Sequence, residues 1–178
     1  MVDNILNSIT HFYPEIAIVV TLCAIIIGDL LIKRKGHTGG GILMCGMVVT
    51  GFLLLAQTGV NQSVFFDMIA VDPFALYFKL LITLATIFVI LFSMKSRELD
   101  EYSNRISEYY MLIAGMVLGM FLMVSSTNLL LMYLAFEMTS ISSYVLVGFT
   151  KKSDKSSEAS MKYIIYGAVA SGIMIYGI

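Results

Sequence analysis

Glu137 is the residue whose type and position first suggest chemistry. It lies inside the apolar segment 128–149 (NLLLMYLAFEMTSISSYVLVGF), which is about as long as one bilayer-spanning helix. A charged side chain at the centre of such a helix costs roughly 3 kcal/mol on insertion scales, so it usually faces a protein interior or water. A carboxylate placed there can accept and release protons, and the segment therefore predicts a functional site.

Hydroxyl groups accompany this carboxylate at helical spacing. Tyr133, Glu137, Ser140 and Tyr144 follow a 4-3-4 pattern, which puts them on one face of a helix. A row of proton donors and acceptors on one face favours a hydrated proton relay. The alternative is a satisfied buried carboxylate that holds two helices together.

Two lysines lie inside apolar segments as well. Lys162 follows Glu158 by four residues, so it either forms an ion pair near the membrane surface or takes part in proton transfer, and we favour proton transfer. For Lys79 we consider two roles equally. Its long side chain either snorkels toward water or contacts another subunit.

The elements that must position these residues are membrane helices. Hydrophobic residues make up 58% of the 178 residues and charged residues only 13%, which is far from the composition of a soluble domain. The apolar segments predict an all-α polytopic membrane protein with a single transmembrane domain and about six transmembrane helices. Their approximate ranges are 14–32, 41–56, 74–93, 109–124, 128–149 and 158–178.

Local signals refine these ranges. Asp72 before Pro73 is typical of a helix start, and Asn128 is expected to cap the helix that carries Glu137. Gly115 and Gly119 have the spacing of small residues that lets membrane helices approach closely.

The basic residues predict the orientation in the bilayer. Nine of the eleven Lys and Arg residues follow the first, third and fifth predicted helices, whereas the amino-terminal segment and the loop 57–73 hold none. Because cytoplasmic loops carry the excess of positive charge, we expect the amino terminus outside. The same scatter through short loops excludes a basic patch for nucleic acid. The nine residues are Lys33, Arg34, Lys35, Lys95, Arg97, Arg105, Lys151, Lys152 and Lys155.

We expect no metal or redox cofactor in this chain. Cys23 and Cys45 lie within predicted helices and are interpreted as buried packing residues, and His11 and His37 are lone histidines without ligand spacing. A dinucleotide-binding GxGxxG motif after a strand is also missing.

Four stretches resemble a known family. They are FYPEIAIV with the following GDLL, DPFALYFKLL, SSTNLLLMYLAFEMTSISSYVLVGF and SSEASMKYIIYGAVASGIMIYGI. Together they are similar to the N subunit of proton-pumping NADH-quinone oxidoreductase, which is respiratory complex I. The glutamate in LAFEMTSISSYVL and the lysine in SSEASMKYIIYGA match two charged residues that the family uses in translocation, so the resemblance assigns those roles to Glu137 and Lys162.

The resemblance also implies a setting. Such a chain belongs to an antiporter-like bundle built from inverted repeats, of which these residues would be the amino-terminal part, truncated at the carboxyl end. Its partners would be the lipid bilayer and other membrane-arm subunits, both antiporter-like and small. NADH, FMN, iron–sulfur clusters and quinone would be used by other subunits of the complex, which would couple quinone reduction to proton pumping. The expected location is the bacterial inner membrane, with an organellar inner membrane as the alternative.

Other functions stay open from the sequence. A cation/proton antiporter subunit of the Mrp type, or a membrane subunit of an energy-converting hydrogenase, uses the same glutamate and lysine chemistry without this quinone step. A scaffold subunit of a complex would use Glu137 and Lys162 only to hold helices together. A small free-standing carrier is the least favoured. The choice between H⁺ and Na⁺ is also open.

Overall fold

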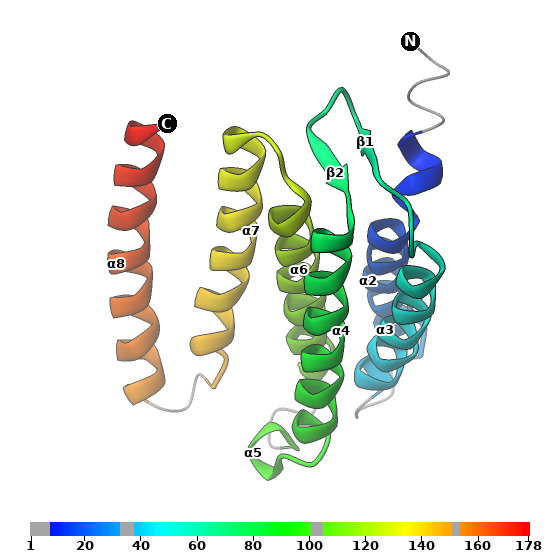
Figure 1. Ribbon diagram of the computed structural model, residues 1–178. Helices are drawn as coiled ribbons and strands as arrows, with labels where there is room; N and C mark the ends of the chain where they lie inside the picture. Colours follow the sequence, from blue (N-terminus) through cyan, green and yellow to red (C-terminus); the bar gives the residue numbers. More distant parts are fainter. Residues whose placement is uncertain (1–7, 33–37, 101–104, 151–153) are drawn as a thin grey trace.

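A computed structural model describes residues 8–32, 38–100, 105–150 and 154–178 of the chain. Six long helices cross the molecule side by side, and a β-hairpin covers one end of the layer (Figure 1). The helices are α2 (Tyr13–Ile32), α3 (Thr38–Ala56), α4 (Pro73–Ser93), α6 (Ile106–Ser125), α7 (Leu129–Val147) and α8 (Asp154–Gly177), with the short α5 (Arg97–Asp100) after α4. The strands are β1 (Gln62–Val64) and β2 (Ile69–Val71).

Two helix starts confirm the predicted caps. The Asp72 carboxylate accepts a hydrogen bond from the Ala75 amide at 2.7 Å, and Pro73 occupies the first turn of α4. The Asn128 side chain accepts from the Leu130 amide at 2.8 Å at the start of α7. Each cap satisfies an amide that has no partner within its helix.

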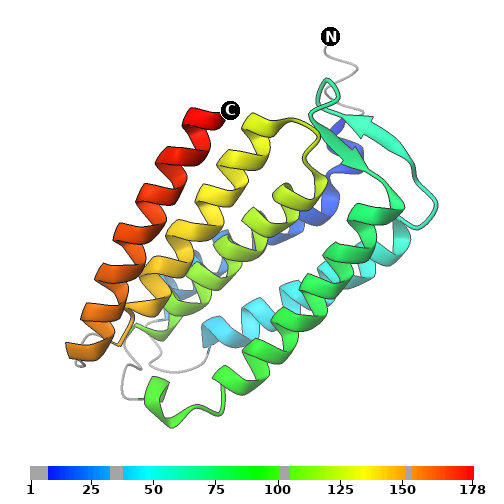
Figure 2. The same cartoon turned by 60° about the vertical axis from the view of Figure 1, so that its left-hand side comes forward.

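Helix α6 is the centre of the arrangement. It packs against α2, α4 and α7, whereas α8 packs beside α7 at the edge of the layer (Figure 2). The core therefore lies around α6, and its side chains come mainly from α2, α3, α4 and α6 itself. Its fully buried members include Ile18, Ile25, Leu43, Met47, Leu54, Ile90, Tyr110, Val117 and Phe121.

The predicted close approach of helices is confirmed at Gly119. A Cβ atom added there would meet the Thr139 hydroxyl and would lie 3.0 Å from the Ala135 carbonyl oxygen and the Thr139 amide nitrogen of α7. At Gly115 the nearest atom would be the Ser142 hydroxyl at 3.4 Å. The two helices thus approach more closely at Gly119 than at Gly115, beside the part of α7 that carries Glu137.

The β-hairpin is a feature that the all-α interpretation missed. Gln62, Ser63 and Val64 pair with Val71, Ala70 and Ile69, and the two strands have three residues each. Strands this short carry too few residues for a clear alternation of apolar and polar side chains. The turn between them contains consecutive positive φ angles at Phe65, Phe66 and Asp67.

Contacts on both sides hold the hairpin in place. The Thr127 amide donates to the Met68 carbonyl at 3.0 Å, and the Thr127 hydroxyl donates to the Asp67 carbonyl. The Phe65 amide donates to the Ser8 hydroxyl at 3.1 Å. The hairpin therefore links the loop between α6 and α7 to the residues before α2.

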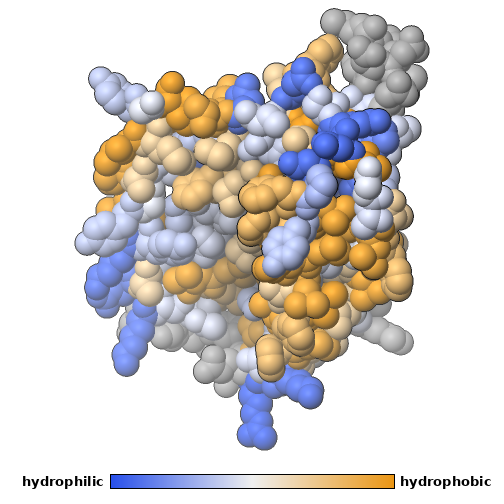
Figure 3. All heavy atoms as spheres, in the orientation of Figure 1, coloured by the Kyte–Doolittle hydropathy of each residue, from blue (hydrophilic) through white to orange (hydrophobic). Residues whose placement is uncertain are grey.

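The long helices have the character of membrane spans. Five of the described helices, which are α2, α3, α4, α6 and α7, are long and apolar enough to cross a bilayer. Helix α8 has 24 residues and carries its charged residues in its first half. Hydrophobic side chains cover the middle of the layer over α4 and α3, and hydrophilic ones gather at the hairpin end (Figure 3). Cys23 and Cys45 are free and exposed, so their interpretation as buried packing residues is wrong.

Candidate functional site

Glu137 lies on α7 in a half-buried position. Its Oε1 atom is buried and has no hydrogen-bond partner among the described residues. Tyr133 lies one helical turn earlier on the same face of α7. One oxygen of this carboxylate therefore lacks the partner that buried polar atoms normally have.

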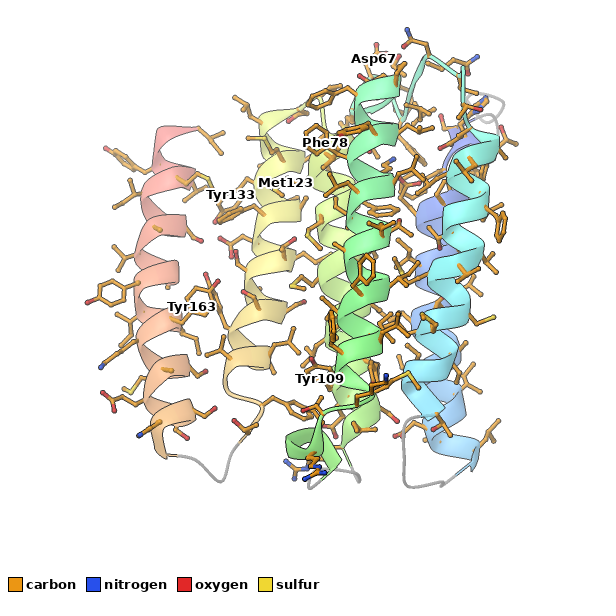
Figure 4. All side chains as sticks on the ribbon, turned by 60° about the horizontal axis from the view of Figure 1, so that its bottom comes forward. Asp67, Phe78, Tyr109, Met123, Tyr133 and Tyr163 are labelled. Atoms are coloured by element: carbon orange, nitrogen blue, oxygen red, sulfur yellow. The ribbon has the colours of Figure 1, made fainter. Side chains whose placement is uncertain are left out.

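The hydroxyl side chains that share this face lie at the junction with α8. Tyr133 and Tyr163 both extend into the space between α7 and α8 (Figure 4). The Tyr144 ring packs edge-on against Tyr163, with 4.8 Å between ring centroids, and its hydroxyl occupies the space left by the missing side chain of Gly167. Ser140 is buried on α7.

Ser171 on α8 is a candidate that sequence reasoning missed. It is 7% exposed, and its hydroxyl is buried without a partner among the described residues. Helices α7 and α8 run in opposite directions, and Tyr144 contacts Gly167. One further turn along α8 therefore brings Ser171 to the depth of Ser140, which lies one turn before Tyr144 on α7.

Two buried polar atoms without partners thus lie on neighbouring helices. They belong to Glu137 and Ser171. A single serine in an apolar helix gives no sequence signal of such a role, because serine hydroxyls in membrane helices commonly bond to their own backbone. Only the register of α7 against α8 identifies Ser171.

Lys162 lies on the exposed face of α8. Its Nζ atom is 2.5 Å from Oε1 of Glu158, and the two side chains are 65% and 66% exposed. The structure therefore pairs Lys162 with Glu158 and does not bring the two predicted translocation residues, Glu137 and Lys162, into contact. An exposed pair of this kind contributes little to stability, so it leaves Lys162 able to exchange partners.

Lys79 differs from both roles predicted for it. It is 2% exposed and its Nζ lies 2.5 Å from Oε1 of Glu15, which is 1% exposed. Because the ammonium group is buried, snorkelling is wrong, and because its partner belongs to α2 of the same chain, a role in contacting another subunit is wrong too. The two residues are 64 positions apart, so no local pattern in the sequence could link them.

The described residues contain no group of three or more His, Cys, Asp and Glu side chains that could hold a metal ion. The chemistry available between α7 and α8 is that of one carboxylate and several hydroxyls. Such groups can bind a proton or an oxygen-coordinated cation and can order water.

Known proteins similar to this chain are membrane subunits of respiratory complexes. The family model described as "NADH:quinone oxidoreductase/Mrp antiporter, TM" matches residues 126–178, which include Glu137 and Lys162. NADH-quinone oxidoreductase subunit N 2 of Chloroherpeton thalassium is 44% identical over 99% of this chain and 35% of its own length. Subunit N of an Anaeromyxobacter species is 36% identical over 99% of this chain and 34% of its own length.

Solved structures share the fold. A chain of respiratory complex I from Thermus thermophilus superposes with a TM-score of 0.77 at 25% identity, covering 92% of this chain and 35% of that one. A chain of the membrane-bound sulfane sulfur reductase, an archaeal respiratory membrane complex, gives 0.80 at 20% identity, covering 95% of this chain and 36% of that one.

The chain spans about a third of the length of the curated relatives that it matches. The matched part covers 99% of this chain and so extends from α2 to α8. The chain is thus similar over nearly its whole length to NADH-quinone oxidoreductase subunit N, and over residues 126–178 to the antiporter-like membrane family.

Proposed function

We propose that this chain forms part of a proton-translocating subunit in the membrane arm of NADH-quinone oxidoreductase. Quinone reduction elsewhere in the complex would drive translocation through buried charged groups, with Glu137 as the proton acceptor. Curated relatives named subunit N, matched over nearly the whole chain, support this assignment.

One observation carries the proposal, which is the buried Oε1 atom of Glu137 without a partner. A carboxylate that served only to join two helices would have its oxygens satisfied by the helix it joins, because a buried acceptor without a partner is costly. Glu137 instead has a buried oxygen without a partner among the described residues. That arrangement suits a group that exchanges its partner during turnover.

Hydroxyl groups beside Glu137 provide the remainder of the relay. Ser140 and Ser171 lie on the two helices that border the site, and Tyr144 lies one turn further toward the end of α7. Water held between these groups would carry the proton between them and the carboxylate. We propose H⁺ as the transported ion, because a carboxylate and hydroxyls can pass protons along ordered water.

Lys162 would exchange protons with the aqueous phase on the side of the membrane where α5 lies. Its ion pair with Glu158 is exposed, and protons from the aqueous phase can reach it. We assign this side to the cytoplasm because Lys95, Arg97 and Arg105 follow α4 there, which places the amino terminus outside. Lys162 would accept a proton when a carboxylate approaches and release it when the carboxylate leaves.

The rest of the complex would supply the redox chemistry. NADH, flavin, iron–sulfur clusters and quinone would bind to other subunits, while this chain contributes proton transfer within the bilayer. Other membrane-arm subunits would be its partners, and the bacterial inner membrane would be its location.

The test is the Glu137→Gln variant of the full-length subunit in inverted membrane vesicles. A native gel first establishes that the complex assembles, and proton uptake per NADH oxidised is then measured. The matched control is Glu108→Gln, which neutralises an exposed carboxylate at the start of α6. We expect uptake to fall at least tenfold for Glu137→Gln and to stay unchanged for Glu108→Gln. Wild-type uptake by an assembled Glu137→Gln complex would show that the carboxylate only holds helices together, as in a scaffold subunit.

A cation/proton antiporter subunit is the second candidate, because the matching family model covers Mrp antiporters as well. Vesicles without NADH or quinone distinguish the two. An imposed Na⁺ gradient that drives proton movement dependent on Glu137 would favour the antiporter, and its absence would favour the oxidoreductase subunit. An energy-converting hydrogenase would be recognised by the subunits that co-purify with the chain.

A further inference from the structure

A second charged site lies inside the bundle, away from Glu137. Lys79 of α4 and Glu15 of α2 form an ion pair at 2.5 Å, and their side chains are 3% and 1% exposed. Lys79 also lies over the ring of Phe121 of α6, with 5.9 Å between Nζ and the ring centroid. The pair therefore joins α2 and α4 and contacts α6.

Stability alone does not account for such a pair. Removing two charges from water is costly, and well-packed hydrophobic residues of similar volume often replace buried ion pairs without loss of stability. Ionisable residues are rare within membrane spans, and those that occur commonly serve function. The Glu15–Lys79 pair has no part in the relay between α7 and α8.

The pair and Glu137 lie on opposite sides of α6 at a similar depth. Phe121, which contacts Lys79, is two residues from Gly119. Gly119 in turn contacts α7 at Ala135 and Thr139, the residues that bracket Glu137. Helix α6 thus receives the pair on one side and positions the Glu137 segment on the other.

The contact between α6 and α7 leaves little room for adjustment. Ala135 and Thr139 approach Gly119 so closely that an added Cβ would lie only 3.0 Å from their backbone atoms. Phe121 is fully buried, so a change at the ammonium group beside it has no empty space into which to relax. A displacement of Phe121 would therefore be passed to α7.

We propose that Glu15 and Lys79 are positioning residues, which hold α6 so that Glu137 lies where it can exchange protons. The inference rests on the proposed function of Glu137. It gives the Glu15–Lys79 pair, which is two helices away from Glu137, a role in coupling NADH oxidation to proton transfer. This role requires that the two charges be opposite, whichever position carries the positive one.

The experiment compares two double variants of the full-length subunit in the assembled complex. Glu15→Gln with Lys79→Met removes both charges at similar volume, and Glu15→Lys with Lys79→Glu exchanges them. Thr50→Val is the matched control, because Thr50 is also fully buried and its hydroxyl, among the described residues, bonds to the Gly46 carbonyl of its own helix. Proton uptake per NADH oxidised and the rate of NADH oxidation are measured in inverted vesicles.

We expect the neutral double variant to oxidise NADH at the wild-type rate while proton uptake per NADH falls at least twofold. The exchanged variant should recover most of this loss, and Thr50→Val should behave as wild type. Wild-type uptake by the neutral variant would overturn the proposal, and so would an exchanged variant that assembles but stays uncoupled.

Assembly separates a positioning role from a purely structural one. If the neutral variant does not assemble, the exchanged variant decides, and its failure to assemble as well would assign the pair to folding alone and overturn the proposal. The Glu137→Gln variant is measured beside them. Wild-type uptake by Glu137→Gln would refute the proposed function itself, whereas wild-type uptake by the neutral pair alone refutes only this inference.

Discussion

Gly119→Ala is the substitution for which the structure predicts the most specific effect. The added Cβ would meet the Thr139 hydroxyl and would lie 3.0 Å from the Ala135 carbonyl oxygen and the Thr139 amide nitrogen, where ordinary contact begins at 3.4 Å. The Thr139 side chain can rotate away, but the backbone atoms cannot. Helices α6 and α7 must therefore separate by about 0.4 Å at this level, and overpacking of this kind costs about 2 kcal/mol.

The consequence should appear in both stability and proton transfer. Because Ala135 and Thr139 bracket Glu137, the carboxylate moves with the backbone that Gly119 contacts. The complex is heated in detergent, the fraction that stays assembled is read from native gels, and proton uptake per NADH is measured in vesicles. We expect Gly119→Ala to lose assembly several degrees earlier and to pump less.

Gly115→Ala is the matched control for this prediction. It lies one turn earlier on the same helix, and its added Cβ would meet only the Ser142 hydroxyl at 3.4 Å, the end of a side chain that can turn aside. If Gly119→Ala and Gly115→Ala lose stability and pumping to the same extent, the close backbone contact at Gly119 is not what positions α7, and the reasoning fails.

Three further substitutions test other parts of the structure. Lys79→Met alone should destabilise the subunit by about 3–5 kcal/mol because it leaves the buried Glu15 carboxylate unpaired, and the loss of assembled complex on native gels should shrink when Glu15→Gln is added. Asp72→Ala should cost about 1 kcal/mol by removing the cap of α4, seen as a lower assembly temperature, whereas Asp72→Asn should cost much less. Ser171→Ala should slow proton uptake without affecting assembly, because the hydroxyl would serve only the water beside Glu137, and an unchanged rate would remove Ser171 from the relay.

The helices followed from the composition and from local signals. Apolar segments of about twenty residues can satisfy their backbone in a bilayer only as helices, so their number and order required no knowledge of packing. The helix starts are marked by Asp72, Pro73 and Asn128. The two capping side chains bond to backbone amides only two or three residues away. The prediction that Glu137 is a functional residue also rests on its sequence context alone, since a carboxylate in the middle of an apolar helix is unusual in any fold.

The β-hairpin could not be predicted in this way. Its strands are three residues long, and its position depends on bonds to Ser8 and Thr127, which lie far from it in the sequence. The role of Ser171 likewise depends on which part of α7 it approaches.

For Lys162 the sequence had offered two roles, an ion pair with Glu158 and proton transfer. The structure contains the ion pair.

The sequence by itself determined that the chain is a set of membrane helices with a carboxylate inside one of them, because those properties are set by residue types within a single helical segment. Only the tertiary structure decided which charges pair between different helices. Glu15 and Lys79 meet across 64 positions because α2 and α4 both pack around α6, and that contact arises from the shapes of three helices together. Ion pairs between distant segments leave no periodic pattern in a sequence, so their partners become known only when the helices are assembled.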